Sequence, residues 1–428
     1  MDYATDYDVG ESKRAGGINE DSVAVLVFED GHREGAEPPD RDPGGADEAA
    51  EGPEETRPER ASGSEDPDDE ELTIADVLSG QAVDGATADT DPDTDPETDS
   101  GTDPGGDPER DPDTDRDTDQ SGEGRNRSTA VFALADGAGG HEAGDVASYL
   151  ASTVVCEHLA ETAVRAARCD PDPFDLEVGA SLPAPPTTDD LQAAIEDAVI
   201  AAHRAVLDYA VDVGQAAYTT VVAGIAVGGE LHYGWVGDSR AYVCNRRHET
   251  IERLTTDHGV VTQLAESGEI DEVEAMVHPR GNEITRALGG TPVPEDDPTV
   301  EVDLNTIDLY GDDLVLVTSD GLIDAQTDAP DLYEAYVAAD RSEAAAETVR
   351  DAVVTEAEIR DVVLEADSLG TAASDLVALA NDRGGKDNIS TLLFGDAALG
   401  DPPATEPARG VADPPPVEQR DTVVLKEE

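Results

Sequence analysis

The chain has 428 residues, and 100 Asp+Glu outnumber 27 Lys+Arg to give a formal net charge of −73. Such a chain is repelled by a nucleic-acid backbone and by an anionic membrane surface, which excludes both kinds of partner where binding depends on charge. The composition is acid-rich and nearly lysine-free, which indicates a halophilic protein that stays soluble in a very salty cytoplasm, where salt screens the self-repulsion.

The first predicted element is a strand at 22–28, and the composition changes directly after it. From 30 to 127 the chain is rich in Pro, Gly, Thr and acid, and 14 of the 32 residues from Asp89 to Gln120 are acidic. Such a segment buries too little apolar surface to offset its chain entropy, so we expect a disordered insertion. An apolar island at 71–78 inside it is either a docking helix for a partner or a transient turn.

Order returns at Ser128, and one domain is expected to span 1–397 apart from its insertions. Further strands are predicted at 129–135, 219–227, 231–236, 240–244, 300–304, 313–319 and 388–394. Helices are predicted at 143–167, after an N-cap at Thr188, and at 260–267, 341–354 and 372–381. A second insertion covers 169–187, and a Pro-rich acidic tail at 398–428 is predicted to be disordered. Short strands bracketed by helix pairs favour α+β layers over alternating βαβ units.

Acidic residues recur where predicted strands begin or end. Asp136-Gly137 and Asp320-Gly321 each follow an apolar strand, Asp238 follows a third, and Asp387 and the pair Glu20-Asp21 each precede one. Each Asp-Gly taken alone is better explained by a hairpin turn. Carboxylates gathered at strand ends would repel one another, and a hard divalent cation such as Mg²⁺ or Mn²⁺ would relieve that repulsion. Two such cations suit displacement at phosphorus.

Seven motifs, in this order along the chain, carry a resemblance to a known family. They are Asn19-Glu20-Asp21, Asp136-Gly137-Ala138-Gly139-Gly140-His141, Tyr218-Thr219-Thr220, Gly237-Asp238-Ser239-Arg240, Thr256-Asp257-His258, Ser319-Asp320-Gly321 and Gly385-Lys386-Asp387-Asn388. Together they resemble the protein phosphatase 2C family of PPM-type, metal-dependent Ser/Thr phosphatases. The resemblance implies a four-layer α-β-β-α sandwich of two antiparallel sheets flanked by helices.

The resemblance also implies roles for the acidic residues. Asp136 would bridge two Mn²⁺ or Mg²⁺ ions, the Gly137 carbonyl and Glu20 would hold one of them, and Asp320 and Asp387 would hold the other. Asp21 would act through a water, and Asp238 would help to bind a weaker third ion. Catalysis would then pass through Asp136, Asp320 and Asp387, which position a metal-bridging hydroxide for in-line attack on phosphoserine or phosphothreonine.

The sequence departs from the family pattern at two positions. Gly16 stands where the family has a phosphate-binding Arg, and Arg14, with Lys13 beside it, is the candidate replacement. Ala138 stands where eukaryotic members have a candidate general-acid His, so the source of the leaving-group proton stays open. His141 is interpreted as structural.

Several other residues have structural predictions. Arg240 is expected to pair with nearby carboxylates and Trp235 to pack in the core. Thr256-Asp257-His258 is expected to cap the following helix, and 268–281 corresponds to the family's mobile flap. The long insertion, by its position after the first strand, is expected near the catalytic mouth.

Three functions compete at this point: an active phosphatase, a pseudophosphatase or phosphoprotein-binding regulator, and an acidic scaffold. The complete set of acidic ligands favours the first. Its partners would be Ser/Thr-phosphorylated proteins and a cognate kinase pathway. The three cysteines form no CxxC pair, the N-terminus has no signal-peptide pattern, and no apolar run approaches membrane-spanning length. We therefore expect a cytoplasmic monomer.

Overall fold

The computed structural model describes residues 1–14, 17–28, 129–138, 143–167, 184–293, 298–409 and 425–426. The predicted disordered insertion at 30–127, its apolar island at 71–78 and His141 lie outside the described residues. Most of the second predicted insertion, 169–187, lies outside them as well.

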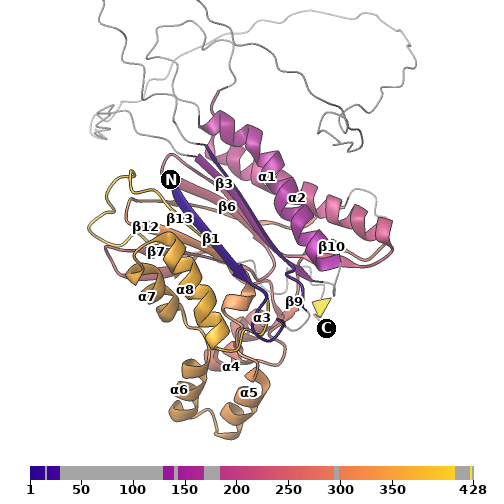
Figure 1. Cartoon of the computed structure of the whole chain (residues 1–428), viewed down its shortest axis with the longest axis vertical. Coiled ribbons are helices and arrows are strands. Elements are labelled where there is room, and N and C mark those ends of the chain that lie inside the picture. The colour runs from indigo at the N-terminus through magenta and orange to yellow at the C-terminus, as the bar shows by residue number, and fades with distance from the viewer. Residues whose placement is uncertain are drawn as a thin grey trace, which may run out of the picture. The chain divides into compact units, whose positions relative to one another are not determined.

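Two antiparallel sheets form the middle of the fold (Figure 1). The first has the strand order β1 (Asp2–Asp8), β13 (Ile389–Gly395), β12 (Asp313–Thr318), β7 (Arg240–Asn245) and β8 (Thr250–Arg253). The second sets β2 (Asp21–Phe28), β3 (Thr129–Ala138), β5 (Val221–Val227), β6 (Glu230–Val236) and β11 (Asp303–Asp308) side by side. At the end of β3 the second sheet continues into β4 (Ala217–Thr219) and β10 (Leu288–Gly290).

Strand β3 is apolar at every position from Ala130 to Ala135 because both of its faces are buried. Successive side chains of a strand point to opposite faces. Val131 and Ala133 face a core shared with helices, whereas Phe132 and Leu134 face the core between the two sheets. Both faces of β3 are therefore covered, and an alternating polar pattern would leave polar groups buried.

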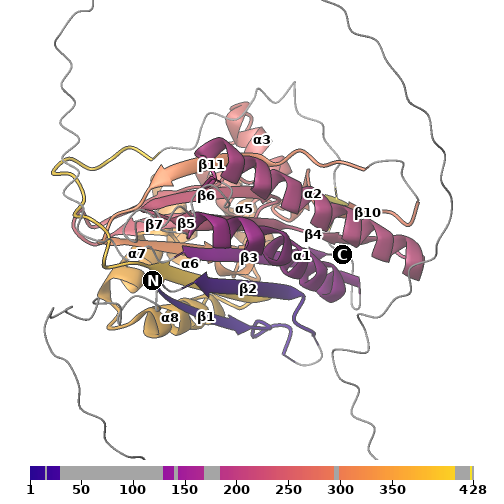
Figure 2. The same ribbon diagram turned by 90° about the horizontal axis from the view of Figure 1, so that it is seen from above.

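Helices cover the outer face of each sheet, and Figure 2 shows them on opposite sides of the molecule. Helices α1 (Ala143–Ala166) and α2 (Thr188–Val213) pack on the second sheet through small and branched residues such as Ala147, Leu159 and Ile195. Helices α7 (Glu356–Glu365) and α8 (Leu369–Asp382) pack on the first through residues such as Ile359 and Leu376. The predicted four-layer sandwich is confirmed.

A smaller unit of helices lies at one end of the sandwich (Figure 1). It contains α3 (Val260–Glu266), α4 (Glu272–Met276), α5 (Ala329–Ala338) and α6 (Glu343–Ala352), and the short strand pair β9 (Glu283–Ile284) and β14 (Leu425–Lys426). Val273 and Val277 pack there against Tyr336 and Val349 in a separate small core. The predicted flap, 268–281, is therefore fixed at α4 by hydrophobic contacts.

Several element boundaries differ from the predictions. The N-cap of α2 is Thr187 and not Thr188, because Thr187 and Asp190 complete a reciprocal capping box in which each side chain accepts the other's N–H. The predicted strand 219–227 is two strands, broken where the Thr220 N–H donates to the Asp136 carbonyl at 2.8 Å. The strand predicted at 300–304 instead begins at Asp303, opposite Trp235 in β6.

The predicted disordered tail, 398–428, differs from the structure over its first part. Residues 398–409 lie on the first sheet, where the Gly311 N–H donates to the Gly400 carbonyl at 3.0 Å. The Arg409 side chain is 5% exposed, pairs with buried Asp313 at 2.8 Å and stacks over the Tyr310 ring. A buried carboxylate needs partners. Asn245 and the Tyr310 N–H also donate to Asp313, but Arg409 supplies the positive charge, which the acidic composition of the tail concealed.

Candidate metal centre

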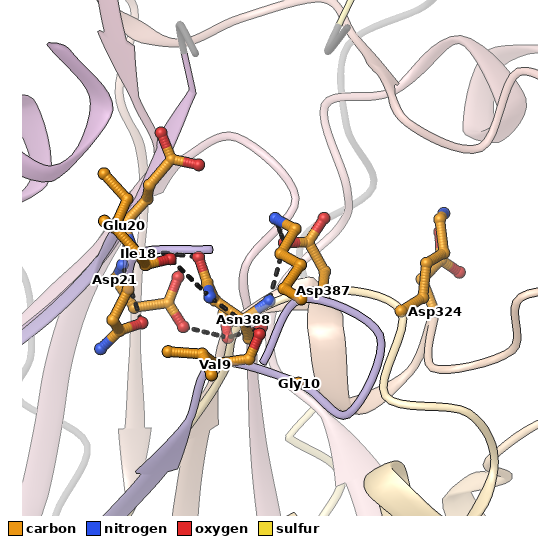
Figure 3. A network of polar contacts seen from close by, with 12 residues as sticks. Val9, Gly10, Ile18, Glu20, Asp21, Asp324, Asp387 and Asn388 are labelled. Atoms are coloured by element: carbon orange, nitrogen blue, oxygen red, sulfur yellow. Dashed lines mark hydrogen bonds and ion pairs between the residues drawn. The ribbon is translucent and has the colours of Figure 1, made fainter. Parts of the chain in front are cut away.

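The acidic motifs meet at one edge of the sandwich, where strands of both sheets end (Figure 3). In the second sheet, the antiparallel register sets Asp21, the first residue of β2, directly opposite Asp136 in β3. In the first sheet, Asp320 follows β12 and Asp387 precedes β13, its antiparallel neighbour. Because β12 and β13 run in opposite directions, the end of one and the start of the other lie at the same edge.

Ser319 connects the two sheets at this edge. Its hydroxyl donates to Asp21 Oδ2 at 2.9 Å and accepts the Ser390 N–H at 3.0 Å. Close backbone packing sets the neighbouring residues, because a Cβ on Gly321 would lie 1.9 Å from the Asn388 carbonyl oxygen. Only glycine lets the Asp320 turn approach the Asp387-Asn388 segment this closely.

The Asn388 side chain organises the N-terminal side of the centre. Its Oδ1 accepts the Glu20 N–H at 3.0 Å, and its Nδ2 donates to the carbonyls of Val9 and Ile18 (Figure 3). One amide thereby fixes both ends of the loop that joins β1 to β2. This loop carries Lys13, Arg14 and Glu20.

Asp136 and Gly137 are held by backbone and hydroxyl contacts. Thr220 Oγ1 accepts the Asp136 N–H at 3.0 Å, and Thr219 Oγ1 donates to the Asp136 carbonyl at 2.8 Å. The Gly137 N–H donates to the Glu20 carbonyl at 3.1 Å. A Cβ on Gly144, at the start of α1, would lie 2.6 Å from Glu20 Oε1 and 3.1 Å from the Gly137 carbonyl oxygen. A glycine at 144 therefore lets these two oxygens lie close to one another.

The carboxyl groups disturb one another's ionisation. Burial, opposed by hydrogen bonds from Ser390 and Ser319, raises the pKa of Asp21 to about 6, and the charge of Asp387 adds to the rise. Burial and the charges of Asp387 and Asp324 raise the pKa of Asp320 to about 7. Carboxylates that cost this much to ionise together are a site for positive charge.

Lys13 supplies positive charge at the centre. Its ammonium donates to Asp387 Oδ1. Partial burial opposes its charged form, but the carboxylates of Asp387, Glu20 and Asp136 raise its pKa. Arg14 has a different environment: its guanidinium pairs with Asp8 at 2.9 Å and with Glu11, and its side chain is 49% exposed. Of the two neighbours, Lys13 lies among the acidic residues.

The donor set fits a hard divalent cation. It consists of carboxylate oxygens and a backbone carbonyl, the ligands that Mg²⁺ and Mn²⁺ prefer. Among the described residues, the buried Asp21 Oδ1 has no hydrogen-bond partner, as expected for an oxygen that faces a cation or its water. Within these same residues no three His, Cys, Asp or Glu side chains are grouped closely enough to hold a metal ion. The fit therefore rests on donor chemistry and placement.

Asp238 is joined to the centre through its neighbour. Ser239 shares a 2.7 Å hydrogen bond with Thr220, whose Oγ1 accepts the Asp136 N–H. Gly237, before Asp238, has a φ of +109° and accordingly suits glycine. The role of Asp238 in binding a third ion stays a prediction.

The residues after Asp238 confirm one structural prediction and correct another. Arg240 pairs with Asp257 at 2.6 Å as expected, and although burial opposes it, the guanidinium lowers the pKa of Asp257. Because Asp257 is used in this pair, it does not cap α3, whose N-cap is Gly259 with no side-chain hydrogen bond. Trp235 is 2% exposed, as predicted for a core residue.

Three polar residues that organise the centre had no assigned role in the sequence-based interpretation. Ser319, Thr220 and Asn388 all lie inside the quoted motifs, so their positions were visible but their function was not. Only the fold shows that each one bonds to a residue remote in the chain.

A family model described as protein phosphatase 2C matches residues 115–361. The serine/threonine phosphatase stp of Listeria welshimeri is 29% identical over 266 residues, which cover 61% of this chain and 83% of that protein. The protein phosphatase PhpP of Streptococcus pneumoniae is 28% identical over 175 residues, or 41% of this chain and 56% of that one.

Solved structures of serine/threonine phosphatases are also similar to this chain. The Mycobacterium tuberculosis serine/threonine phosphatase PstP/Ppp matches with a TM-score of 0.44 and 27% identity, over 62% of this chain and 88% of that one. The catalytic domain of PstP solved with two manganese ions matches with a TM-score of 0.42 and 26% identity, over 61% and 86%. No helix in the described parts of the chain is both long and apolar enough to cross a membrane.

Proposed function

The chain belongs to the protein phosphatase 2C family of metal-dependent serine/threonine phosphatases, and from this premise we propose that it hydrolyses phosphoserine and phosphothreonine monoesters in proteins with two Mn²⁺ or Mg²⁺ ions. The observation that carries the proposal is the convergence of Asp21 and Asp136 from one sheet with Asp320 and Asp387 from the other.

The proposed ligand set follows the family pattern. Asp136 would take part in holding both ions, Glu20 and the Gly137 carbonyl would hold the first, and Asp320 and Asp387 would hold the second. Asp21 would act through a water, and Asp238 would contribute to a weaker third ion. The raised pKa values of Asp21 and Asp320 support this set, because a bound cation would compensate the charges that burial and repulsion disfavour.

When bound, such ions supply an activated water for in-line attack on phosphorus and neutralise the charge of the phosphoryl group. The chain's own residues then bind and orient the ester. We assign Lys13 to the phosphate, since its ammonium pairs with Asp387 and the charges of Glu20 and Asp136 also act on it. Ser319 and Asn388 hold the ligands in position through the hydrogen bonds described above.

The decisive experiment is metal-dependent hydrolysis of p-nitrophenyl phosphate and a phosphothreonine peptide in a high-salt buffer. We expect turnover that requires Mn²⁺ and falls by at least about a hundredfold in Asp136→Asn and Asp320→Asn, because loss of a group that stabilises the transition state costs on the order of 10²–10³. Asp375→Asn is the matched control, since Asp375 is exposed on α8.

Two results would contradict the proposal. Turnover that is unchanged in Asp136→Asn would remove the centre from the chemistry. Mn²⁺ binding by calorimetry without turnover on either substrate would instead support the alternative, a pseudophosphatase that binds phosphoproteins.

The physiological context is part of the proposal. Substrates would be Ser/Thr-phosphorylated proteins made by a cognate kinase, and the acid-rich composition suits a salty cytoplasm. Phosphoproteomics of a deletion strain would identify sites whose occupancy rises, and light scattering in high salt would test the proposed monomer.

A further inference from the structure

A short segment near residue 425 forms a strand pair with the flap unit. Leu425–Lys426 (β14) pairs antiparallel with Glu283–Ile284 (β9), with Leu425 opposite Ile284 and Lys426 opposite Glu283. Figure 1 shows β9 beside the end marked C. The register therefore fixes which residue of each strand lies opposite which, and it supplies the positions for a test of the pairing.

Strand β9 is connected to the candidate metal centre on its other side. Ile284 also forms a bridge with Gly259, and the Thr285 N–H donates to the His258 carbonyl at 2.7 Å. His258 Nδ1 in turn accepts the Gly237 N–H at 3.0 Å. Two hydrogen bonds thus lead from β9 to the residue before Asp238.

An ion pair and a backbone hydrogen bond connect the flap to β9. Arg280 pairs with Glu283 at 2.6 Å, and the Glu283 N–H donates to the Arg280 carbonyl at 3.1 Å. Both β9 residues are buried, at 6% and 3% exposure. A strand that pairs with β9 should consequently restrict the motion of both the flap and the loop at 255–258.

Binding of an extended segment to a strand edge uses main-chain hydrogen bonds, and edges without a partner recruit other strands. We propose that the outer edge of β9 is a docking site for an extended peptide strand, that the segment around Leu425–Lys426 of this same chain is its resident occupant, and that occupancy holds the flap in one position. Arg409, buried against Asp313, anchors the chain ahead of this segment.

The consequence for catalysis rests on the proposed function. The family resemblance gives this flap a part in substrate choice, so a flap held by its own strand should restrict a phosphoprotein more than a small aryl phosphate. Release of the segment should therefore raise kcat/KM for phosphopeptides several-fold and leave p-nitrophenyl phosphate hydrolysis unchanged.

The pairing itself is tested without any enzymatic readout. In the full chain carrying Cys169→Ser, the pair Glu283→Cys and Lys426→Cys should form a disulfide under mild oxidation, because directly opposite Cβ atoms lie about 4.5–5.5 Å apart, near the span of a disulfide. Cys156 and Cys244 are buried, and burial raises the pKa of each to about 12, so neither should compete. The matched control, Glu283→Cys with Glu406→Cys in the exposed part of 401–408, should not cross-link.

A second measurement covers the case in which Glu283→Cys disturbs the flap. In the double variant Leu425→Pro and Lys426→Pro, which removes both donors, amide hydrogen exchange of 280–286 should accelerate relative to Ala412→Pro. Equal exchange in the two variants, or equal cross-linking of the test and control pairs, would overturn the docking site. Neither readout involves turnover, so failure of the phosphatase proposal would leave this test intact.

Discussion

Lys13 and Arg14 are adjacent in the chain but differ in their surroundings. Arg14 was the residue that the sequence pattern offered as the phosphate contact, and that assignment stays a prediction. The structure gives its guanidinium two carboxylate partners near the surface, Asp8 and Glu11. Lys13 instead faces the acidic edge through Asp387. The choice between them depends on the conformation of the β1–β2 loop, which spacing alone does not show.

We therefore predict different effects for the two matched substitutions. Lys13→Met should raise KM for a phosphopeptide and weaken inhibition by inorganic phosphate by about tenfold, since a hydrogen bond to a charged group contributes about 1.5–3 kcal/mol. Arg14→Met should change both by less than about twofold, because exposed ion pairs contribute about 0–1 kcal/mol. Steady-state kinetics with phosphate as a competitive inhibitor measure both effects. The reverse pattern would return the role to Arg14.

At the scale of elements, the sequence predicted correctly whether a segment is a strand or a helix where its run of apolar residues was long. The strand predicted at 129–135 and the helix predicted at 143–167 match β3 and α1 closely, because both lie in the apolar interior over most of their length. The strand β1 was missed, since its alternating Asp, Tyr and Thr residues pair with β13 from an edge position and are largely exposed. Its strand state depends on the partner and not on its own hydrophobicity.

For the candidate site, the sequence predicted the acidic residues but not the contacts that position them. The acidic residues could be found because motifs mark strand ends, yet the contacts that position them come from residues more than 70 positions away. Asn388 reaches Glu20, and Ser319 reaches Asp21. Such contacts are set by the register of two sheets, which a single sequence does not specify.

His203 joins helix α2 to strand β10 of the second sheet and makes the stability of the fold depend on pH. From α2 its Nδ1 accepts the Gly289 N–H of β10 at 3.0 Å. Burial, with a smaller effect of Arg204, lowers its pKa from 6.5 to about 4. The unfolded chain therefore binds more protons than the native one between these values. The contribution of the buried, neutral His203 to the free energy of unfolding is therefore complete above pH 6.5, and it is lost as the pH falls toward 4.

The corresponding prediction compares the native chain with His203→Asn, which keeps an acceptor but does not titrate. The difference in unfolding free energy between the two should change by about 3 kcal/mol from pH 7 to pH 4, at about 1.4 kcal/mol per pKa unit. Urea denaturation in high salt at several pH values measures it, and all other titrating groups cancel in the difference. Parallel curves for the two proteins would contradict the assignment.

At the scale of the whole molecule, the long insertion leaves the domain far from the candidate centre. It joins Phe28 to Thr129, which lie opposite each other at one end of the β2–β3 pair. Asp21 and Asp136 are opposite each other at the other end of the same pair. The insertion is therefore attached at the end of the β2–β3 pair opposite the acidic residues. The prediction that it lies near the catalytic mouth concerns residues outside the described part of the chain and stays a prediction.

Salt should stabilise the whole molecule. Of the 100 acidic residues, 34 lie in 30–127 and 66 lie elsewhere, against 27 Lys+Arg in total. The folded domain itself is therefore strongly negative, and its self-repulsion is screened as the Debye length falls from about 10 Å at 0.1 M salt to about 3 Å at 1 M. We expect the thermal midpoint to rise steadily from 0.1 to 2 M KCl in differential scanning fluorimetry. A variant lacking 31–126 should retain most of this rise, because most of the acidic residues remain. A midpoint independent of salt, or a dependence that disappears in the deletion variant, would show that the domain does not carry the destabilising charge.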